Sequence, residues 1–134
     1  MNIDAITTKY QPVVLSLLRF ITGLVFLQYG FAKLFKWPPV PMFAKVEWMS
    51  LYGAAGTCEL VGGILLILGL FTRPVAFLVC GEMAIAYFHT HFPNGFFPIL
   101  NGGNLAILFC FIFLYLAFAG GGSISLDAAL RKKS

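Results

Sequence analysis

The chain has 134 residues, of which 60% are apolar, and its mean hydropathy is +0.90. Nine basic and five acidic residues make it only 10% charged, whereas a soluble domain carries roughly 25%. So few charges exclude a water-soluble fold, and the high hydropathy excludes disorder. Four membrane-spanning helices of roughly 20 residues each would account for the apolar residues of the chain. We therefore predict a single domain, an all-α, integral membrane four-helix bundle.

The first predicted span covers residues 12–35. Pro12 suits a first helical turn, because proline lacks an N–H group that would be unpaired there. The segment is too long for a cleaved secretory signal, contains Arg19, Gln28 and Lys33, and is not followed by a small-residue cleavage site. We expect it to be retained as a membrane helix.

The next segment, residues 37–41, contains three prolines, which exclude a helix. Residues 42–49 are amphipathic and include Trp48, so we expect them at the outer membrane interface. The second and third spans are predicted at residues 51–71 and 74–92. The short link between them forces an antiparallel helical hairpin.

The fourth predicted span covers residues 104–119. Three glycines at 120–122 provide a bend, and residues 125–131 are predicted to form one or two helical turns at the membrane surface. With four spans, both termini lie on the same side as the link at Arg73. That side carries five basic residues and the other carries three, so the positive-inside rule predicts cytoplasmic termini. The five are Lys9, Arg73, Arg131, Lys132 and Lys133, and the three are Lys33, Lys36 and Lys45.

The basic residues at the ends of the spans are expected to contact lipid headgroups, and no basic stripe indicates a nucleic-acid partner. The three cysteines, Cys58, Cys80 and Cys110, lie in separate apolar runs. Their spacing indicates neither a disulfide framework nor a zinc site, so we expect buried, reduced thiols. Small-residue faces on the second span would also allow a homo-oligomer, and its glycines are expected at close helix contacts.

Four charged residues fall within the predicted spans, namely Arg19, Lys33, Glu59 and Glu82. From the helix rise, Arg19 lies about 10 Å from the cytoplasmic end, Glu82 about 12 Å and Glu59 about 18 Å. We therefore expect Arg19 to pair with Glu82 and to reach toward Glu59, whereas Lys33 lies near the outer surface and snorkels. This cluster is interpreted either as a lock for the bundle or as a functional site.

A second polar group is predicted at the outer end, where His91 ends the third span and Asn104 begins the fourth. His89 and His91 would point about 200° apart on a helix and would not share a metal. No metal site is therefore predicted. The sequence also contains no self-contained catalytic motif, such as a nucleotide-binding loop or a nucleophile elbow.

Several segments together resemble the DoxX family of small four-span membrane proteins. They are Leu18-Arg19, Gly56-Thr57-Cys58-Glu59, Gly62-Gly63, Thr72-Arg73-Pro74, Ala86-Tyr87-Phe88, His91, Asn101-Gly102-Gly103 and Ser125-Leu126-Asp127. The resemblance covers nearly the whole chain and implies a bacterial cytoplasmic (inner) membrane protein. Two positions depart from the family pattern: Asn104 stands where the family usually has an acid, and Gly121 stands where it often has proline.

The resemblance implies a link to quinone-dependent sulfur oxidation or to oxidative stress. Our first hypothesis is a quinone-associated redox component, such as a subunit of a quinone-linked oxidoreductase, with no intrinsic cofactor. The second is a non-enzymatic scaffold that recruits a soluble redox or detoxifying partner, and the third is a small-solute carrier or channel. The candidate ligand or proton-site residues are Arg19, Glu59, Glu82, Tyr87, His91 and Asn104, with Phe88 as an aromatic wall.

Overall fold

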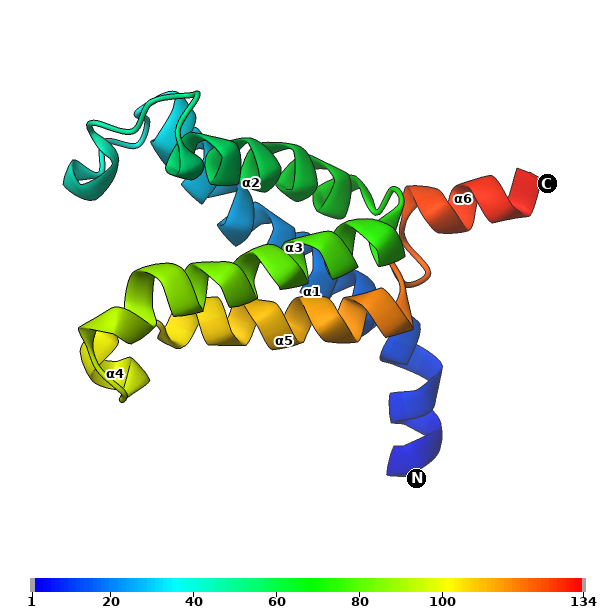
Figure 1. The fold of residues 1–134 in the computed structure, drawn as a ribbon. Helices are drawn as coiled ribbons and strands as arrows, with labels where there is room; N and C mark the ends of the chain where they lie inside the picture. Colours follow the sequence, from blue (N-terminus) through cyan, green and yellow to red (C-terminus); the bar gives the residue numbers. More distant parts are fainter. Residues whose placement is uncertain (1, 134) are drawn as a thin grey trace.

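The computed structural model describes residues 2–133, and these are mainly helical, with no strand. Four long helices form the bundle (Figure 1). They are α1 (Ile3–Leu34), α2 (Leu51–Leu68), α3 (Thr72–Ala86) and α5 (Asn104–Ala119). The helices α1 and α2 and the continuous segment Thr72–Asn94 are long and apolar enough to cross a membrane, and α5 is a shorter apolar helix. The predicted helical membrane bundle is thus confirmed.

Helix α1 begins nine residues before Pro12. Its N-cap is Asn2, whose side chain accepts hydrogen bonds from the N–H groups of Asp4 (3.0 Å) and Ala5 (3.4 Å). Pro12 lies inside the helix, so its placement in a first turn was wrong. The N-terminal part of α1 leaves the bundle at the lower right of Figure 1. A capped end outside the bundle therefore extends this helix beyond its predicted span.

Helix α2 is bounded by two local caps. The Ser50 side chain accepts from the N–H of Gly53 (3.0 Å) at its start. At its end Gly69 adopts a left-handed conformation with φ 70°, which a residue without a Cβ tolerates, so the helix stops at Leu68. The segment before α2 forms only a short 3₁₀ turn, η1 (Pro41–Phe43).

The third long helix changes geometry at its outer end. α3 continues into a π-helical turn, η2 (Tyr87–His91), and a 3₁₀ turn, η3 (Phe92–Asn94), and the short helix α4 (Pro98–Asn101) leads into α5. A π-helical turn widens the helix and frequently occurs at functional sites. Here it rotates the histidine-bearing segment relative to a regular α-helix.

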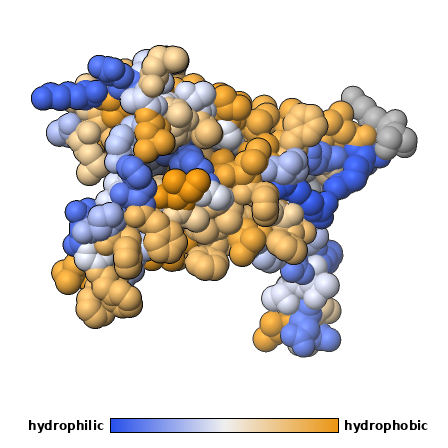
Figure 2. All heavy atoms as spheres, viewed as in Figure 1, coloured by the Kyte–Doolittle hydropathy of each residue, from blue (hydrophilic) through white to orange (hydrophobic). Residues whose placement is uncertain are grey.

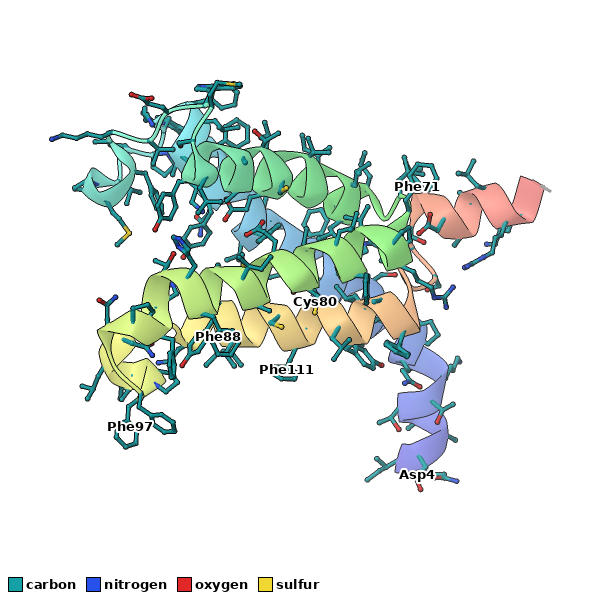
Figure 3. All side chains as sticks on the ribbon, in the orientation of Figure 1. Asp4, Phe71, Cys80, Phe88, Phe97 and Phe111 are labelled. Carbon is teal, nitrogen blue, oxygen red and sulfur yellow. The ribbon has the colours of Figure 1, made fainter. Side chains whose placement is uncertain are left out.

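The long helices pack as two pairs, α1 with α2 and α3 with α5, and the pairs diverge toward the left of Figure 1. Phe26 of α1 fills the space between them, since it is fully buried and contacts Phe109 and Phe113 of α5 edge-on at 5.4 and 4.9 Å between ring centroids. Cys80 of α3, which Figure 3 labels, lies next to Cys110 of α5, with the two Sγ atoms 3.6 Å apart. Two cysteines from separate apolar runs are thus neighbours. All three are free thiols, but Cys58 is exposed and not buried as expected.

The face of the bundle seen in Figure 2 is mainly apolar. Large side chains such as Phe77, Phe111 and Phe118 are more than half exposed, and Figure 3 shows Phe111 pointing away from the bundle. In water such a surface would be unstable, whereas lipid tails solvate it. The exposed apolar side chains therefore form the lipid-facing surface.

The chain termini lie at the same end of the bundle, on the right of Figure 1. The C-terminal helix α6 (Leu126–Lys133) projects from this end. It is tied to the α2–α3 turn by Asp127, whose carboxylate accepts from the N–H groups of Phe71 (2.8 Å) and Thr72 (2.9 Å). The N–H of Asp127 in turn donates to the carbonyl of Gly69 (2.9 Å).

Candidate functional site

A cavity of about 690 Å³ lies at the end of the bundle opposite the termini. Both helix pairs line it, together with the loop that precedes α2. Its walls are mainly aromatic, aliphatic and sulfur-containing side chains, and they include Phe26, Tyr29, Phe43, Met83 and Phe109. Binding cavities for small molecules are commonly 300–1,000 Å³ and largely apolar, with few polar groups. This cavity has that size and character.

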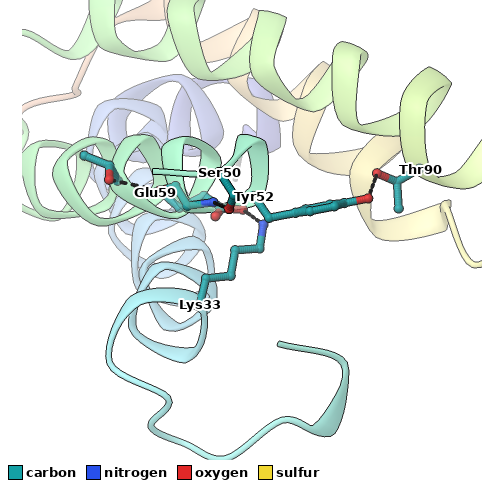
Figure 4. Close-up of polar contacts among 7 residues, drawn as sticks. Lys33, Ser50, Tyr52, Glu59 and Thr90 are labelled. Carbon is teal, nitrogen blue, oxygen red and sulfur yellow. Dashed lines mark hydrogen bonds and ion pairs between the residues drawn. The ribbon is translucent and has the colours of Figure 1, made fainter. Parts of the chain in front are cut away.

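The main charged feature of the cavity is a buried ion pair. Nζ of Lys33 lies 2.8 Å from Oε1 of Glu59, and both residues are less than a tenth exposed (Figure 4). The expectation that Lys33 snorkels was wrong. Gly56 of α2 allows the close approach, because a Cβ added there would lie 2.9 Å from the Cβ of Lys33. The lysine is held inside the helix pair, where Glu59 compensates its charge.

A second carboxyl group in the cavity wall is left without a partner. Both side-chain oxygens of Glu82 are buried and accept no hydrogen bond from the described residues, and the same is true of Oε2 of Glu59. Glu59 and Glu82 both line the cavity. A buried polar atom without a partner costs about 1–3 kcal/mol, so the site contains acceptors that a bound molecule can satisfy.

Arg19 lies outside the cavity and does not form the expected cluster with Glu59 and Glu82. Its Nε donates to the carbonyl of Leu66 (2.8 Å), and its guanidinium also donates to the carbonyls of Ile67 and Gly121. The first two carbonyls belong to the last turn of α2, where the helix dipole favours a positive charge. The arginine therefore joins α1 to the end of α2 and to the glycine turn.

The predicted outer polar residues are divided between two environments. His91 lines the cavity, and its Nδ1 lies 3.2 Å from the carbonyl oxygen of Asn101. Tyr87 is outside the lining and its hydroxyl accepts from Nδ2 of Asn101 (3.2 Å). Asn104 is exposed at the start of α5 and is also outside the lining. The structure thus brings Glu59, Glu82 and His91 to one cavity and leaves Arg19, Tyr87 and Asn104 outside it.

Both histidines of the π-helical turn line the cavity, which the sequence did not predict for His89. The ring of His89 lies 6.3 Å from that of Tyr52 on α2. The Tyr52 hydroxyl is 3.1 Å from Oγ1 of Thr90 and joins the two helix pairs (Figure 4). Among the described residues, no three His, Cys, Asp or Glu side chains are grouped as a metal site.

Sequence reasoning missed Asn101, which is buried and organises the outer turn. Its Oδ1 accepts from the N–H of Gly103 (2.8 Å), and its Nδ2 also donates to the carbonyl of Gly95 (3.0 Å). The Asn-Gly-Gly sequence could have indicated this role, because asparagine side chains bond to the backbone two residues on. Tyr29 and Phe43 were missed as well, since no local pattern marks aromatic cavity walls.

The sequence profile of the DoxX family matches residues 14–92. The chain belongs to the DoxX family. The matched region of this DoxX protein contains Lys33, Glu59, Glu82 and His91, so most of the cavity's polar residues lie in the shared part.

Two relatives align with most of the chain. The DoxX chain is 46% identical over 132 residues to an uncharacterized protein of Haemophilus influenzae, covering 93% of the chain and 96% of the relative. It is 29% identical over 131 residues to the inner membrane protein YphA of Escherichia coli, covering 87% and 90%. No solved structure matches the chain. The protein is thus a membrane protein related to an inner membrane protein.

Proposed function

We propose that this protein is a multi-pass inner-membrane component of a quinone-linked redox or oxidative-stress system and that it binds a quinone-type ligand in the cavity. The observation that carries the proposal is the cavity itself, which combines about 690 Å³ of mainly apolar space with a buried ammonium–carboxylate pair. A filled bundle interior at this position would instead have favoured a scaffold without a ligand.

The lining fits the chemistry of such a ligand. A quinone has a flat apolar ring, which aromatic side chains such as Tyr29, Phe43 and Phe109 can enclose. Its carbonyl oxygens accept hydrogen bonds, and Lys33 supplies an ammonium donor at the cavity wall. When bound, a quinone supplies two-electron chemistry. The residues of this chain bind and orient it and exclude water, and a partner protein or a quinol supplies the electrons.

The test is saturable binding of a decyl-substituted benzoquinone to the full chain in lipid nanodiscs, with empty nanodiscs as the baseline. Ala55→Phe places a ring in the cavity lining, and we expect it to weaken binding at least about tenfold. Val61→Phe is the matched control, because Val61 is on the same helix, half exposed and outside the lining. Equal binding by both variants, or no saturable binding to the unmodified chain, would contradict the proposal.

A scaffold is the second candidate, and α6 is the observation that favours it. This helix projects from the bundle at the end where both termini lie and carries the basic residues Arg131 and Lys132 (Figure 1). Its role would be to recruit a soluble redox or detoxifying protein. Crosslinking in native membranes should then enrich one specific protein, and removal of residues 131–134 should abolish this enrichment. The absence of any enriched protein would contradict the scaffold.

A further inference from the structure

Three carboxylate oxygens in the cavity wall remain open as hydrogen-bond acceptors. Oε2 of Glu59 and both oxygens of Glu82 are buried without a donor from the described residues, and both residues line the cavity. A protein interior rarely leaves such oxygens unpaired, because desolvation without a hydrogen bond is unfavourable. The ligand that complements this wall therefore carries donors.

Two nearby donor groups already have a partner within the protein. Nζ of Lys33 donates to Oε1 of Glu59 and also lies 5.3 Å from the centre of the Phe43 ring. Since a carbonyl oxygen only accepts, the contact of His91 with the carbonyl of Asn101 places a proton on Nδ1. In a neutral imidazole this leaves Nε2 as a further acceptor. Neither group donates to Oε2 of Glu59 or to Glu82, so these carboxylate oxygens stay open.

We propose that the cavity binds the reduced, hydroxyl-bearing form of its ligand, a lipophilic aromatic diol of the quinol class, in preference to the quinone. The two hydroxyl groups would donate to Glu82 and to Oε2 of Glu59, whereas quinone carbonyls offer only further acceptors. A protonated Glu82 would supply one donor and would still leave Oε2 of Glu59 open. This inference rests on the proposed function and adds the redox state that the site selects.

The test compares three probes on the full chain in nanodiscs under anaerobic conditions: a decyl-substituted benzoquinone, its quinol and the O,O-dimethyl ether of that quinol. The three share a ring and a tail, but only the quinol has hydroxyl donors. A hydrogen bond to a charged group contributes roughly 1.5–3 kcal/mol. We therefore expect the quinol to bind about tenfold more tightly than either of the other two probes.

A substitution in the wall provides a second, independent comparison. Glu82→Gln preserves the size of the side chain and adds an amide N–H₂ donor. We expect the preference for quinol to fall in this variant, because one of the three open acceptor oxygens is then replaced by a donor, with quinone binding retained. The matched control is Glu47→Gln, because Glu47 is exposed and lies outside the cavity lining, and it should keep the wild-type preference.

The outcomes separate this inference from the proposed function. Quinone or dimethyl ether binding as tightly as the quinol would overturn the selectivity and leave the ligand class intact. Displacement of the quinol by decylamine at a lower concentration than by unlabelled quinol would show that the carboxylates of the cavity wall bind a cation. That result would overturn the inference. No saturable binding of any aromatic probe would overturn the proposed function together with it.

Discussion

Lys33 lies near the end of α1, yet its ammonium group is inside the protein and paired with Glu59 at 2.8 Å. The cost of burying either charge alone is several kcal/mol in a low-dielectric interior, and the partner offsets part of it. Residue identity alone therefore does not decide whether a lysine snorkels. Whether the lysine side chain reaches the membrane surface depends on the helix face that carries the lysine and on whether a carboxylate lies opposite.

Removal of one member of this pair should destabilise the bundle. We expect Lys33→Met, which leaves Glu59 buried and uncompensated, to lower the free energy of unfolding by about 3–5 kcal/mol. The double variant Lys33→Met/Glu59→Gln should recover much of the loss. Denaturant unfolding in detergent micelles measures both, with Glu47→Gln as the exposed control. A single variant as stable as the double would contradict the buried pair.

Asp127 caps the start of α3 from the C-terminal helix. Burial alone would raise its pKa, but hydrogen bonds from the N–H groups of Thr72 and Phe71, with the attraction of Arg131, hold the pKa below its ordinary value. The folded state thus favours the carboxylate. The stability that it contributes is fully present above the ordinary aspartate pKa of about 3.9 and is lost as pH falls through the lower, folded value.

This cap predicts a specific pH dependence. The amide proton shifts of Phe71 and Thr72 in NMR spectra should titrate with a midpoint below about 3.9. Asp127→Asn should abolish this titration and cost about 0.5–2 kcal/mol, as the loss of a helix cap does. A midpoint above the ordinary aspartate value would contradict the contact between α6 and α3.

At the scale of elements, glycines set the distance between α1 and α2. A Cβ added to Gly30 would lie 2.6 Å from the backbone nitrogen and 2.9 Å from Cα of Leu60. Gly63 is equally close to α1, since an added Cβ would lie 2.9 Å from Cα of Leu27. The sequence-based prediction of close packing at Gly63 is thus confirmed. Small residues allow helix backbones to approach in a membrane, where van der Waals packing drives association.

A pair of glycine substitutions tests this packing. Gly30→Ala must push the α2 backbone away, and we expect it to destabilise the protein by about 1–3 kcal/mol. Gly81→Ala is the matched control, because Gly81 is also helical but an added Cβ would have no neighbour within 4 Å. It should be neutral or stabilising by up to about 1 kcal/mol. Equal unfolding energies for the two variants would contradict the close α1–α2 contact.

At the scale of the whole molecule, the two ends of the bundle differ. The end with the termini is joined by Arg19 and Asp127, while the opposite end opens into the cavity. A hydrophilic patch is visible between the two helix pairs on the left of Figure 2. We propose that the joined end faces the cytoplasm, so that the cavity lies toward the periplasmic side.

Reporter fusions test this orientation. Both termini should lie on the cytoplasmic side, because the side of the bundle that carries them has the larger number of Lys and Arg residues. A fluorescent protein fused after Ser134 should therefore fluoresce, and alkaline phosphatase fused there should be inactive. The same phosphatase inserted at Asn94, in the loop at the cavity end, should be active. Reversed activities would contradict the orientation.

Hydropathy was enough to predict a membrane bundle of apolar helices, and the third predicted span, residues 74–92, overlaps the continuous helical segment Thr72–Asn94. The partners of the buried charges could not be predicted. The helix rise gives the depth of Arg19 but not its rotation about the axis, and its partners are backbone carbonyls that no sequence pattern marks. The π-helical turn likewise depends on tertiary packing, so the joint exposure of His89 and His91 to the cavity was missed.

Ligand binding in the cavity is tested most directly by photoaffinity labelling with an azido-benzoquinone in nanodiscs, followed by peptide mass spectrometry. We predict labels on cavity-lining residues such as Phe43, Tyr52 and Phe109, and we expect excess unlabelled ligand to remove them. Labels confined to lipid-facing residues such as Phe111 and Phe118, unaffected by competitor, would show only partition into lipid and would contradict ligand binding in the cavity.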